Sequence, residues 1–476
     1  MMAETRKYSG SWVFYKKPDL YQGTLYIDDD SHAIRLEIIM PEDGKERTKA
    51  PYTGKIPFIC GTLFTGAKIL LYDCAVKRSR KNYLPYTKIL VYASYAFWGL
   101  EVRQEQALRF QSASFEFGEI VEWTGLCKYK WQSDEKNEYA VWVHKDPVRL
   151  QFRDDLVVEV KPQSTWSGYE SYDTELTLKQ SVWFNFLYKK RVPWETIMED
   201  VLSVRYMIGL GITEKPGIRQ ARYSHPSLNT QIKGVVLGSG LRITQSDVTI
   251  GIEEESHYIQ KKKLDYLYMF DEISSPDRFE TWCQVYPKLK PILDLYFAAC
   301  MSENETDEMF FLNLVQALET FHARFITNKV KEYFRRVDEM TANYPKAEAE
   351  KWHTFLVDAG QQRNKNGIYL RSRLADLTFA EGDILHLTLG EEIDLEEFLQ
   401  KVIFTRNYYT HYDDTKLERS FVMEDIPYVN RILMGLLQYH VLKLLGIGKE
   451  KLKKRMYGTV LSVNMDRTMR EGVHEN

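Results

Sequence analysis

Short, largely apolar runs recur along the first part of the chain, and the run at 148–152 alternates apolar and polar residues. The runs are rich in β-branched and aromatic residues and are separated by Gly, Asp, Asn and Pro, a pattern typical of strands joined by turns. They span residues 12–14, 24–27, 34–39, 68–72, 112–117 and 148–152. We therefore predict a β-dominated region over residues 1–275.

One helix is expected inside this region. From Pro193, apolar residues recur at helical spacing as far as Ile208, and a proline is tolerated in the first turn of a helix. The residues that follow, 209–240, are rich in Gly, Ser and Pro, and this composition predicts a loop.

Beyond Asp277 the apolar residues follow the helical period, in segments that carry the apolar stripe of an amphipathic helix. These segments are 286–299, 308–325, 395–403 and 429–445. Gly446 stands where a helix-ending glycine is expected, and His440 falls on the last apolar stripe, which indicates a core histidine. Such helices form a bundle. The predicted fold class is therefore α+β: a β-rich N-terminal region, an all-α C-terminal bundle over 276–460, and a polar C-terminal tail over 461–476.

Composition limits the class of protein. Hydrophobic residues make up 44% and charged residues 28% of the 476 residues, as in a globular protein of more than one domain. No stretch reaches the roughly 18 consecutive apolar residues that a membrane helix needs, and the N-terminus carries no apolar signal segment. The cysteines are scattered, which predicts neither a zinc site nor a disulfide framework. We expect a cytoplasmic protein without membrane association.

The overall charge does not indicate a nucleic-acid-binding protein, since the net charge is −3 at pH 7. RNA binding would depend on local patches such as the basic runs at 77–81 and 449–455, although runs of this kind are more often solvated surface. The glycine-bearing segments 209–217 and 234–240 lack the Lys-Ser/Thr of a Walker-type phosphate loop. We therefore predict no ATPase activity, no cofactor and no metal site.

Candidate chemistry is concentrated in residues 405–413. A histidine is suited to moving the proton of a ribose hydroxyl near neutral pH. A guanidinium is suited to binding a phosphate on which negative charge builds. Arg406 and His411 would supply both groups from one helix, and the chemistry they indicate is RNA cleavage without a metal ion.

The spacing sets a geometric condition on this hypothesis. On a regular helix Arg406 and His411 lie about 140° apart, whereas Asn407 and His411 share a face. Arg406 therefore reaches the same phosphate if the helix frays or bends near Tyr408 and Tyr409, or if the substrate lies across the end of the helix.

Arg406 also extends the apolar stripe of its helix, because it follows Leu399 and Val402 at helical spacing. A charge on a buried stripe is costly unless it is paired or faces a cleft. Two interpretations stay open: a functional arginine, or a structural arginine that pairs with a carboxylate such as Glu319.

Arg-to-His spacing alone is not selective, because Arg219 with His225 and Arg467 with His474 show similar spacings. The first of these pairs lies in the predicted loop and the second in the polar tail. The pair within 405–413 has in addition a preceding amphipathic helix, an Asn directly after the Arg and a following helix. Context rather than spacing selects it.

Arg-Asn followed by His at the end of a bundle helix, together with Leu-Val-Gln-Ala-Leu-Glu-Thr-Phe-His at 314–322, resembles the HEPN superfamily and within it the ApeA-like branch. Segments 58–63, 69–74 and 115–117, with Trp123, resemble the β-rich domain of that branch. The resemblance covers nearly the whole chain.

The resemblance implies a bacterial anti-phage defence protein that acts by abortive infection. It also implies a HEPN helical bundle that forms a homodimer or higher homo-oligomer and cleaves RNA as a metal-independent endoribonuclease in a composite cleft. His411 would be the general acid/base, Arg406 the phosphate clamp and Asn407 a supporting polar residue. Glu319 matches a recurrent acidic position that would orient Arg406 or His411. His322 is interpreted as a packing or orienting histidine.

In this hypothesis the β-rich region senses a phage-encoded trigger or restrains the nuclease. The alternative is a non-catalytic HEPN module for RNA binding or dimerisation, combined with a ligand-sensing β domain. A weaker third hypothesis is a carbohydrate- or ligand-binding protein built on the aromatic-rich strands, since 13% of the residues are aromatic. No clustered carboxylates or metal-binding loop in the sequence support the third hypothesis.

Overall fold

The computed structural model describes residues 5–28, 33–41, 54–79, 86–100, 102, 108–118, 120–134, 136, 138–167, 177–228, 246–250, 266–301, 306–379 and 394–447. Contacts divide the chain into two compact units, residues 1–204 with 216–260 and residues 205–215 with 261–476. Among the described residues, no helix is long and apolar enough to cross a membrane.

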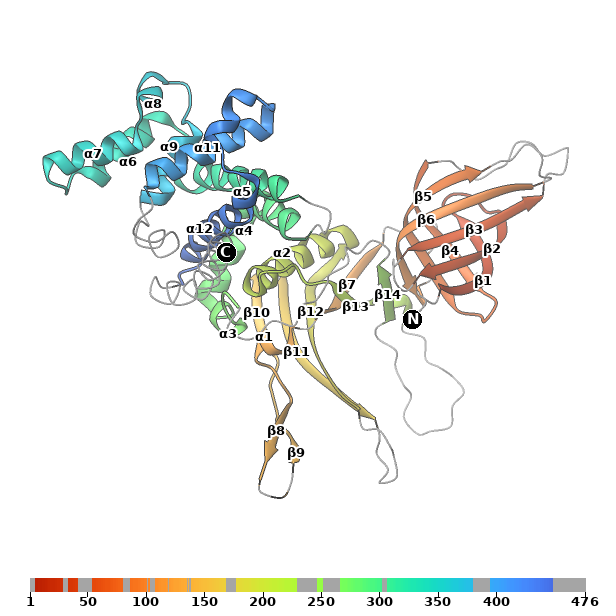
Figure 1. Cartoon of the computed structure of the whole chain (residues 1–476). Helices are drawn as coiled ribbons and strands as arrows, with labels where there is room; N and C mark the ends of the chain where they lie inside the picture. Colours follow the sequence, from red (N-terminus) through yellow and green to blue (C-terminus); the bar gives the residue numbers. More distant parts are fainter. Residues whose placement is uncertain are drawn as a thin grey trace, which may run out of the picture. The chain divides into compact units, whose positions relative to one another are not determined.

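Six antiparallel strands of the first unit close into a barrel, which Figure 1 draws in red and orange. They are β1 (Thr5–Phe14), β2 (Leu20–Asp28), β3 (Ile34–Pro41), β4 (Gly54–Leu63), β5 (Lys68–Ser79) and β6 (Tyr86–Trp98). The order around the ring is β1, β2, β3, β6, β5 and β4, and β4 pairs with β1 again. Alternate side chains point inward, and the enclosed core includes Trp12, Phe14, Leu25, Leu36 and Val91.

Gly61 shows how closely this core is packed. A Cβ atom on Gly61 would lie 2.3 Å from the ring of Trp12, its partner across the β1–β4 pair. The missing side chain at Gly61 therefore makes room for the indole ring.

The end of β6 continues the sheet beyond the barrel. The strands that follow it in order are β14 (Ser246–Ile250), β13 (Ile218–Ser224), β7 (Arg109–Phe117), β12 (Thr177–Pro193), β11 (Leu156–Ser167) and β10 (Val148–Arg153). The first residue of α2 (Trp194–Ile212) packs on this sheet, because the Trp194 ring lies 4.9 Å from that of Phe97 and 5.3 Å from that of Phe110.

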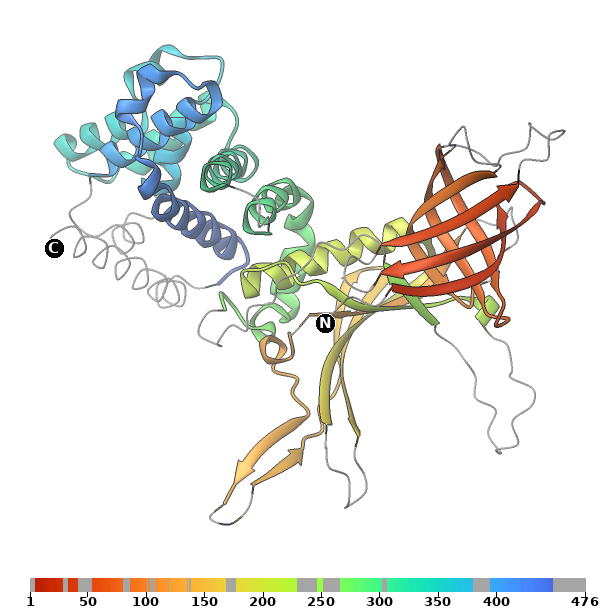
Figure 2. The same cartoon turned by 45° about the vertical axis from the view of Figure 1, so that its right-hand side comes forward.

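A separate hairpin follows the short helix α1 (Val121–Thr124). It consists of β8 (Tyr129–Ser133) and β9 (Glu138–Trp142). Both views show it projecting beside the extended ends of β11 and β12 (Figures 1 and 2). The side-chain oxygen of Gln180 in β12 accepts a hydrogen bond from the backbone N–H of Lys128 at 2.6 Å, and this bond joins the two projections.

The second unit is helical. Its elements are α3 (Phe270–Ile273), α4 (Pro276–Met301), α5 (Asp307–Phe321), the π-helical turn η3 (His322–Ile326), α6 (Val330–Thr341), α7 (Lys346–Leu356), α8 (Ala359–Arg363), α9 (Leu370–Phe379), α11 (Leu395–His411), the 3₁₀ turns η4 (Asp414–Arg419) and η5 (Met423–Asp425), and α12 (Ile426–Leu444). Both α4 and α12 pack against α5. The buried stripe of α5 includes Phe311, Leu314 and Leu318, as its apolar period predicts.

The helix α9 is buried on all sides. Residues 371–378 are all buried, and α5, α7 and α11 contact this helix. It nevertheless carries Arg371, Arg373 and Asp376. Because buried charges are costly without partners, each of these side chains needs a partner inside the bundle.

The α+β prediction is confirmed. Each predicted strand segment lies in one of β1, β2, β3, β5, β7 and β10, and the four helical segments lie in α4, in α5 with η3, in α11 and in α12. Gly446 has a φ of 71°, so the expected helix-ending glycine is also confirmed. The C-terminal tail 461–476 lies outside the described residues.

The prediction of a loop over 209–240 is wrong for its first part. The helix α2 continues to Ile212, and β13 occupies 218–224, while residues 229–245 lie outside the described part of the chain. Gly209 lies inside α2, where the backbone comes close to the Phe297 ring. A Cβ atom on Gly209 would lie 2.8 Å from this ring. This glycine serves close packing rather than a turn.

Candidate active site

The candidate residues lie in the last turns of α11. The helix begins at Asp394, whose side chain accepts hydrogen bonds from the backbone N–H groups of Glu396 and Glu397. It continues without a break to His411. The next residue, Tyr412, adopts a left-handed conformation with φ 50° and ends the helix. The helix is therefore regular past Tyr408, and the fraying considered from the sequence does not occur.

Arg406 reaches toward the His411 side of the helix through its side chain. Its Nη1 donates a hydrogen bond to the side-chain Oδ1 of Asn407 at 3.2 Å. Asn407 and His411 are one turn apart and about 40° apart around the axis, whereas the backbone of Arg406 lies about 140° from His411. The bond to Asn407 therefore turns the guanidinium of Arg406 away from the direction of its own backbone, toward the face that Asn407 shares with His411.

The two functional groups differ in exposure. Arg406 is half-buried beside the fully buried Thr405, and His411 is exposed to solvent. Arg406 thus lies at the margin of the buried stripe rather than on it. A half-buried guanidinium can contact a phosphate, and an exposed imidazole is accessible for proton transfer.

Glu319 does not join this group in the structure. Its Oε1 lies 3.9 Å from Nε of Arg373, and its partner in the described part of the chain is this arginine rather than Arg406 or His411. The physical reason is the burial of α9: Arg373 is only 7% exposed and requires a nearby carboxylate. The sequence-based expectation for Glu319 overlooked this competing cation.

Arg373 belongs to a buried polar network that links η3, which continues α5, with α6 and α9. Its Nη1 donates to Nδ1 of His322 at 3.1 Å, and Nε2 of His322 donates to Oδ2 of Asp376 at 2.9 Å. Arg336 donates to both carboxylate oxygens of Asp376 at 3.0 to 3.1 Å. This network positions three helices of the bundle.

The network keeps His322 neutral. Burial lowers the pKa of His322 by more than the hydrogen bond to Asp376 raises it. In addition, Nδ1 accepts a hydrogen bond from Arg373 and therefore cannot carry the second proton of a charged imidazole ring. Burial raises the pKa of Asp376, but the hydrogen bonds from His322 and Arg336 outweigh it and hold the pKa below its usual range. His322 is fully buried and hydrogen-bonded inside the bundle, which agrees with its interpretation as a packing histidine.

No sequence pattern pointed to Arg336, Arg373 or Asp376. The signal was weak, because a helix buried on all sides shows no amphipathic stripe. His440 is buried and lies 3.0 Å from the carbonyl oxygen of Leu377 through Nε2, so its interpretation as a core histidine is confirmed.

The segment after α11 folds back along the helix. The backbone N–H of Phe421 donates to Oγ1 of Thr405 at 2.9 Å, and the Phe421 ring lies 5.8 Å from that of Phe398. This return segment, 412–425, exposes large apolar side chains close to the candidate residues along the chain. They include Leu417, Val422 and Met423, with exposed fractions of 49%, 59% and 66%.

The other sequence candidates lie elsewhere. Arg219 is in β13, and the ring of His225 lies 5.9 Å from Phe110, with burial lowering its pKa, so this pair belongs to the sheet of the first unit. Residues 80–81, 449–455 and 467–474 lie outside the described residues. In the part of the chain that is described, no group of three His, Cys, Asp or Glu side chains is arranged to hold a metal ion.

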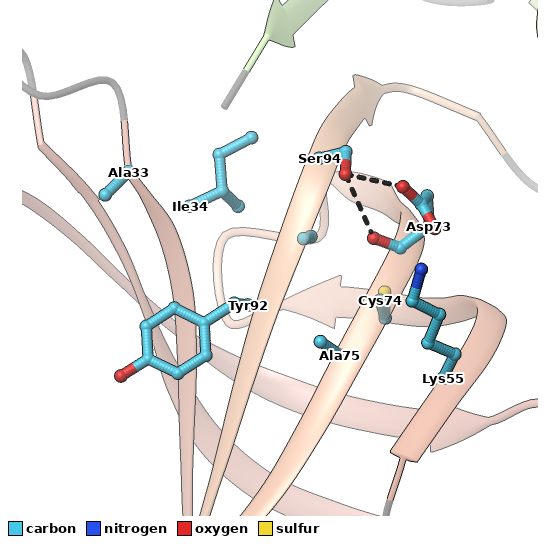
Figure 3. A pocket seen from close by; sticks show the side chains of 9 residues that line it. Ala33, Ile34, Lys55, Asp73, Cys74, Ala75, Tyr92 and Ser94 are labelled. Atoms are coloured by element: carbon cyan, nitrogen blue, oxygen red, sulfur yellow. Dashed lines mark hydrogen bonds between the residues drawn. The ribbon is translucent and has the colours of Figure 1, made fainter. Parts of the chain in front are cut away.

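The first unit has a small surface pocket of about 340 Å³, lined by side chains that include Lys55, Asp73, Tyr92 and Ser94 (Figure 3). Oγ of Ser94 donates to the carboxylate of Asp73 at 2.7 Å. The size suits a small ligand and is too small for a folded RNA. In the alternative hypothesis of a ligand-sensing β domain, this pocket would be the candidate ligand site.

Two family models match the chain. The family model described as Apea-like HEPN matches residues 312–451, and the one described as ApeA N-terminal domain 1 matches residues 7–282. No curated protein and no solved structure matches the chain. The first match contains Arg406, Asn407, His411 and Glu319 and defines a protein with a HEPN nuclease-like module. Because the second match covers more than half of the chain, the chain belongs to the ApeA family of HEPN defence proteins, which confirms the resemblance seen in the sequence.

Proposed function

We propose that the chain is an anti-phage defence endoribonuclease that cleaves RNA by metal-independent general acid/base chemistry at a composite HEPN dimer cleft. The observation that carries this proposal is the hydrogen bond of 3.2 Å between Arg406 and Asn407, on the helix whose last residue is His411. It supports a phosphate-binding guanidinium and an accessible imidazole on one side of α11.

Each side chain has one role in this reaction. The ribose 2′ oxygen attacks the adjacent phosphorus while its proton passes to His411. The bond from phosphorus to the 5′ oxygen then breaks, and the 5′ oxygen takes up a proton, leaving a 2′,3′-cyclic phosphate and a 5′ hydroxyl. Arg406 stabilises the charge on the phosphoryl oxygens, and Asn407 holds Arg406 in place.

A dimer completes the proton transfers. One imidazole accepts the 2′ proton, and His411 of a second copy protonates the leaving 5′ oxygen. The exposed apolar side chains Leu417, Val422 and Met423 on the return segment support a contact between copies near α11, because burying apolar surface against a second copy is favourable.

The β-rich unit has the regulatory role in this proposal. It senses a phage-encoded trigger or restrains the nuclease, and release of the nuclease arrests the infected cell by abortive infection. Membership of the ApeA family and the separate core of the barrel support this division of labour.

The test compares the full-length protein with its His411→Ala and Arg406→Ala variants in phage-infected cells and in vitro. His144→Ala is the matched control, because His144 is an 81% exposed imidazole in the first unit. We expect RNA fragments with 5′ hydroxyl ends from the wild type and the control, cleavage in vitro that persists in EDTA, and a loss of at least about 100-fold in His411→Ala.

Two outcomes would count against the mechanism: cleavage that survives in His411→Ala, or cleavage that stops in EDTA. RNA that remains bound to the purified wild-type protein, without cleavage in infected cells, would favour the non-catalytic RNA-binding or dimerisation module.

A further inference from the structure

Arg419 has an unusual environment on the return segment. Its guanidinium carbon lies 3.7 Å from the centre of the Phe404 ring, and the side chain is exposed. No carboxylate of the described residues forms an ion pair with it, whereas the neighbouring Lys416 lies 3.7 Å from Asp413. Stacking on an aromatic ring fixes a guanidinium through its face and leaves its N–H edge free to bind an anion.

The fold sets where Arg419 lies. The left-handed conformation of Tyr412 reverses the chain, and the bond from Phe421 to Thr405 holds the return segment against α11. Without this anchor the exposed Arg419 would have no fixed position relative to α11. The placement of Arg419 over Phe404 therefore follows from the backbone and not only from the side chain.

Phe404 and His411 face the same side of α11. They are seven positions apart, which places them about 20° apart around the helix axis and about 10 Å apart along it. Arg419 therefore adds a cation to the side of the helix that carries His411. This separation of about 10 Å from His411 along the axis is too great for Arg419 to bind the phosphate that His411 acts on. It suits a phosphate of a neighbouring nucleotide.

We propose that Arg419 is a substrate-binding residue that takes a phosphate flanking the scissile bond of the RNA. The ligand class is the phosphodiester backbone of an RNA strand, which a guanidinium fork binds through two parallel hydrogen bonds. The inference rests on the proposed function for the position of the scissile phosphate. It adds a subsite that Arg406, Asn407 and His411 do not supply.

The test measures binding and turnover separately. Binding of a fluorescein-labelled oligouridylate to full-length protein is followed by anisotropy over a range of salt concentrations, in the His411→Ala background. We expect Arg419→Ala to weaken binding about tenfold and to reduce the salt slope by about one. In the cleaving protein, Arg419→Ala raises KM and leaves kcat nearly unchanged, since the lost contact is made equally in the ground state and the transition state.

Two further variants separate charge from stacking and fold. Arg419→Lys keeps the charge but loses the planar fork, so we expect an intermediate affinity. Arg335→Ala is the matched control, because Arg335 is 74% exposed on α6 and pairs with Glu339; it leaves affinity and salt slope unchanged. The melting temperature and the oligomeric state of each variant are measured alongside.

The subsite is overturned if Arg419→Ala and its parent bind RNA with equal affinity and equal salt slope. It is also overturned if neither protein binds RNA. A shift in the dimer dissociation constant with unchanged RNA affinity overturns it too and assigns Arg419 to the contact between copies. If RNA binding weakens as expected but the wild type never cleaves RNA, Arg419 is still a residue that binds an RNA phosphate, and the nuclease proposal fails.

Discussion

Nη1 of Arg406 donates a hydrogen bond to Oδ1 of Asn407 at 3.2 Å. The two residues are adjacent, yet their backbones face different sides of α11. The amide therefore sets the direction of the guanidinium and brings it toward the side of His411. The proposed catalytic group depends on this one bond for its geometry.

Asn407→Ala should lower kcat more than it changes KM, because Arg406 would lose the group that holds it near the developing charge. We expect a decrease of about 10- to 100-fold in kcat. Thr410→Ala is the matched control, since Thr410 is an exposed polar residue on the same helix whose hydroxyl donates to the carbonyl of Arg406. Steady-state RNA cleavage assays measure both variants, and equal rates for Asn407→Ala and the wild type would remove the role given to this amide.

The neutral state of His322 predicts a pH dependence of stability. Its pKa in the folded protein is lowered below 6.5 by burial, whereas the unfolded chain takes up the proton near the ordinary value. The contribution of neutral His322 to the free energy of unfolding is therefore fully present above pH about 6.5. It is lost as the pH falls from there through the lower pKa that His322 has in the folded protein.

Calorimetric melting between pH 7 and pH 5 tests this expectation. His322→Gln can donate to Asp376 and accept from Arg373 without titrating, so its melting temperature should fall less with pH than that of the wild type. His353→Gln, which changes a histidine 37% exposed in the same unit, serves as control and should follow the wild type. Parallel pH profiles for His322→Gln and the wild type would show that His322 does not titrate as described.

Asp200 anchors α2 to the sheet of the first unit. Nη2 of Arg153 and the hydroxyl of Tyr188 each donate to its Oδ2 at 2.8 Å, and its side chain is only 10% exposed. Asp200→Ala leaves the buried hydroxyl of Tyr188 without this acceptor and removes the Asp200 bonds of Arg153, which keeps its bond to Asp155 at 2.7 Å. We expect a loss of about 2–3 kcal/mol in the free energy of unfolding.

Urea denaturation measures this loss. Glu199→Ala removes an exposed carboxylate one position earlier and should change stability by less than about 0.5 kcal/mol. Similar values for the two variants would mean that the network around Asp200 contributes little.

Gly61→Ala should destabilise the barrel. The new methyl group would lie 2.3 Å from the ring of Trp12, so the strands or the indole must shift, at a cost of about 1–3 kcal/mol. Gly118→Ala is the control, because nothing lies within 4 Å of the position that a Cβ atom would take there. Tryptophan fluorescence during denaturation follows the change directly, and a variant as stable as the wild type would show that the barrel adjusts without strain.

Much of the local structure was predictable from the sequence. The aromatic and β-branched run at 24–27 and the alternation over 148–152 identified strands, and the apolar stripe from Leu395 to Val402 identified a helix. Composition and period are properties of neighbouring residues. The choice of 405–413 as the candidate site also needed only local context. That Glu319 would serve Arg406 or His411 was a further hypothesis, and the structure gives Glu319 a different partner.

Tertiary structure alone determined the relationships between distant residues. Closure of the barrel depends on β4 meeting β1 and β5 meeting β6, and no periodic pattern encodes which strands pair. The network of His322, Arg373 and Asp376 arises because packing buries α9 on all sides, so that charged side chains find partners on other helices. The sequence by itself determined which elements form and which residue types carry the chemistry. The packed fold determined which of those side chains meet, because pairing and side-chain direction depend on neighbours far away in the chain.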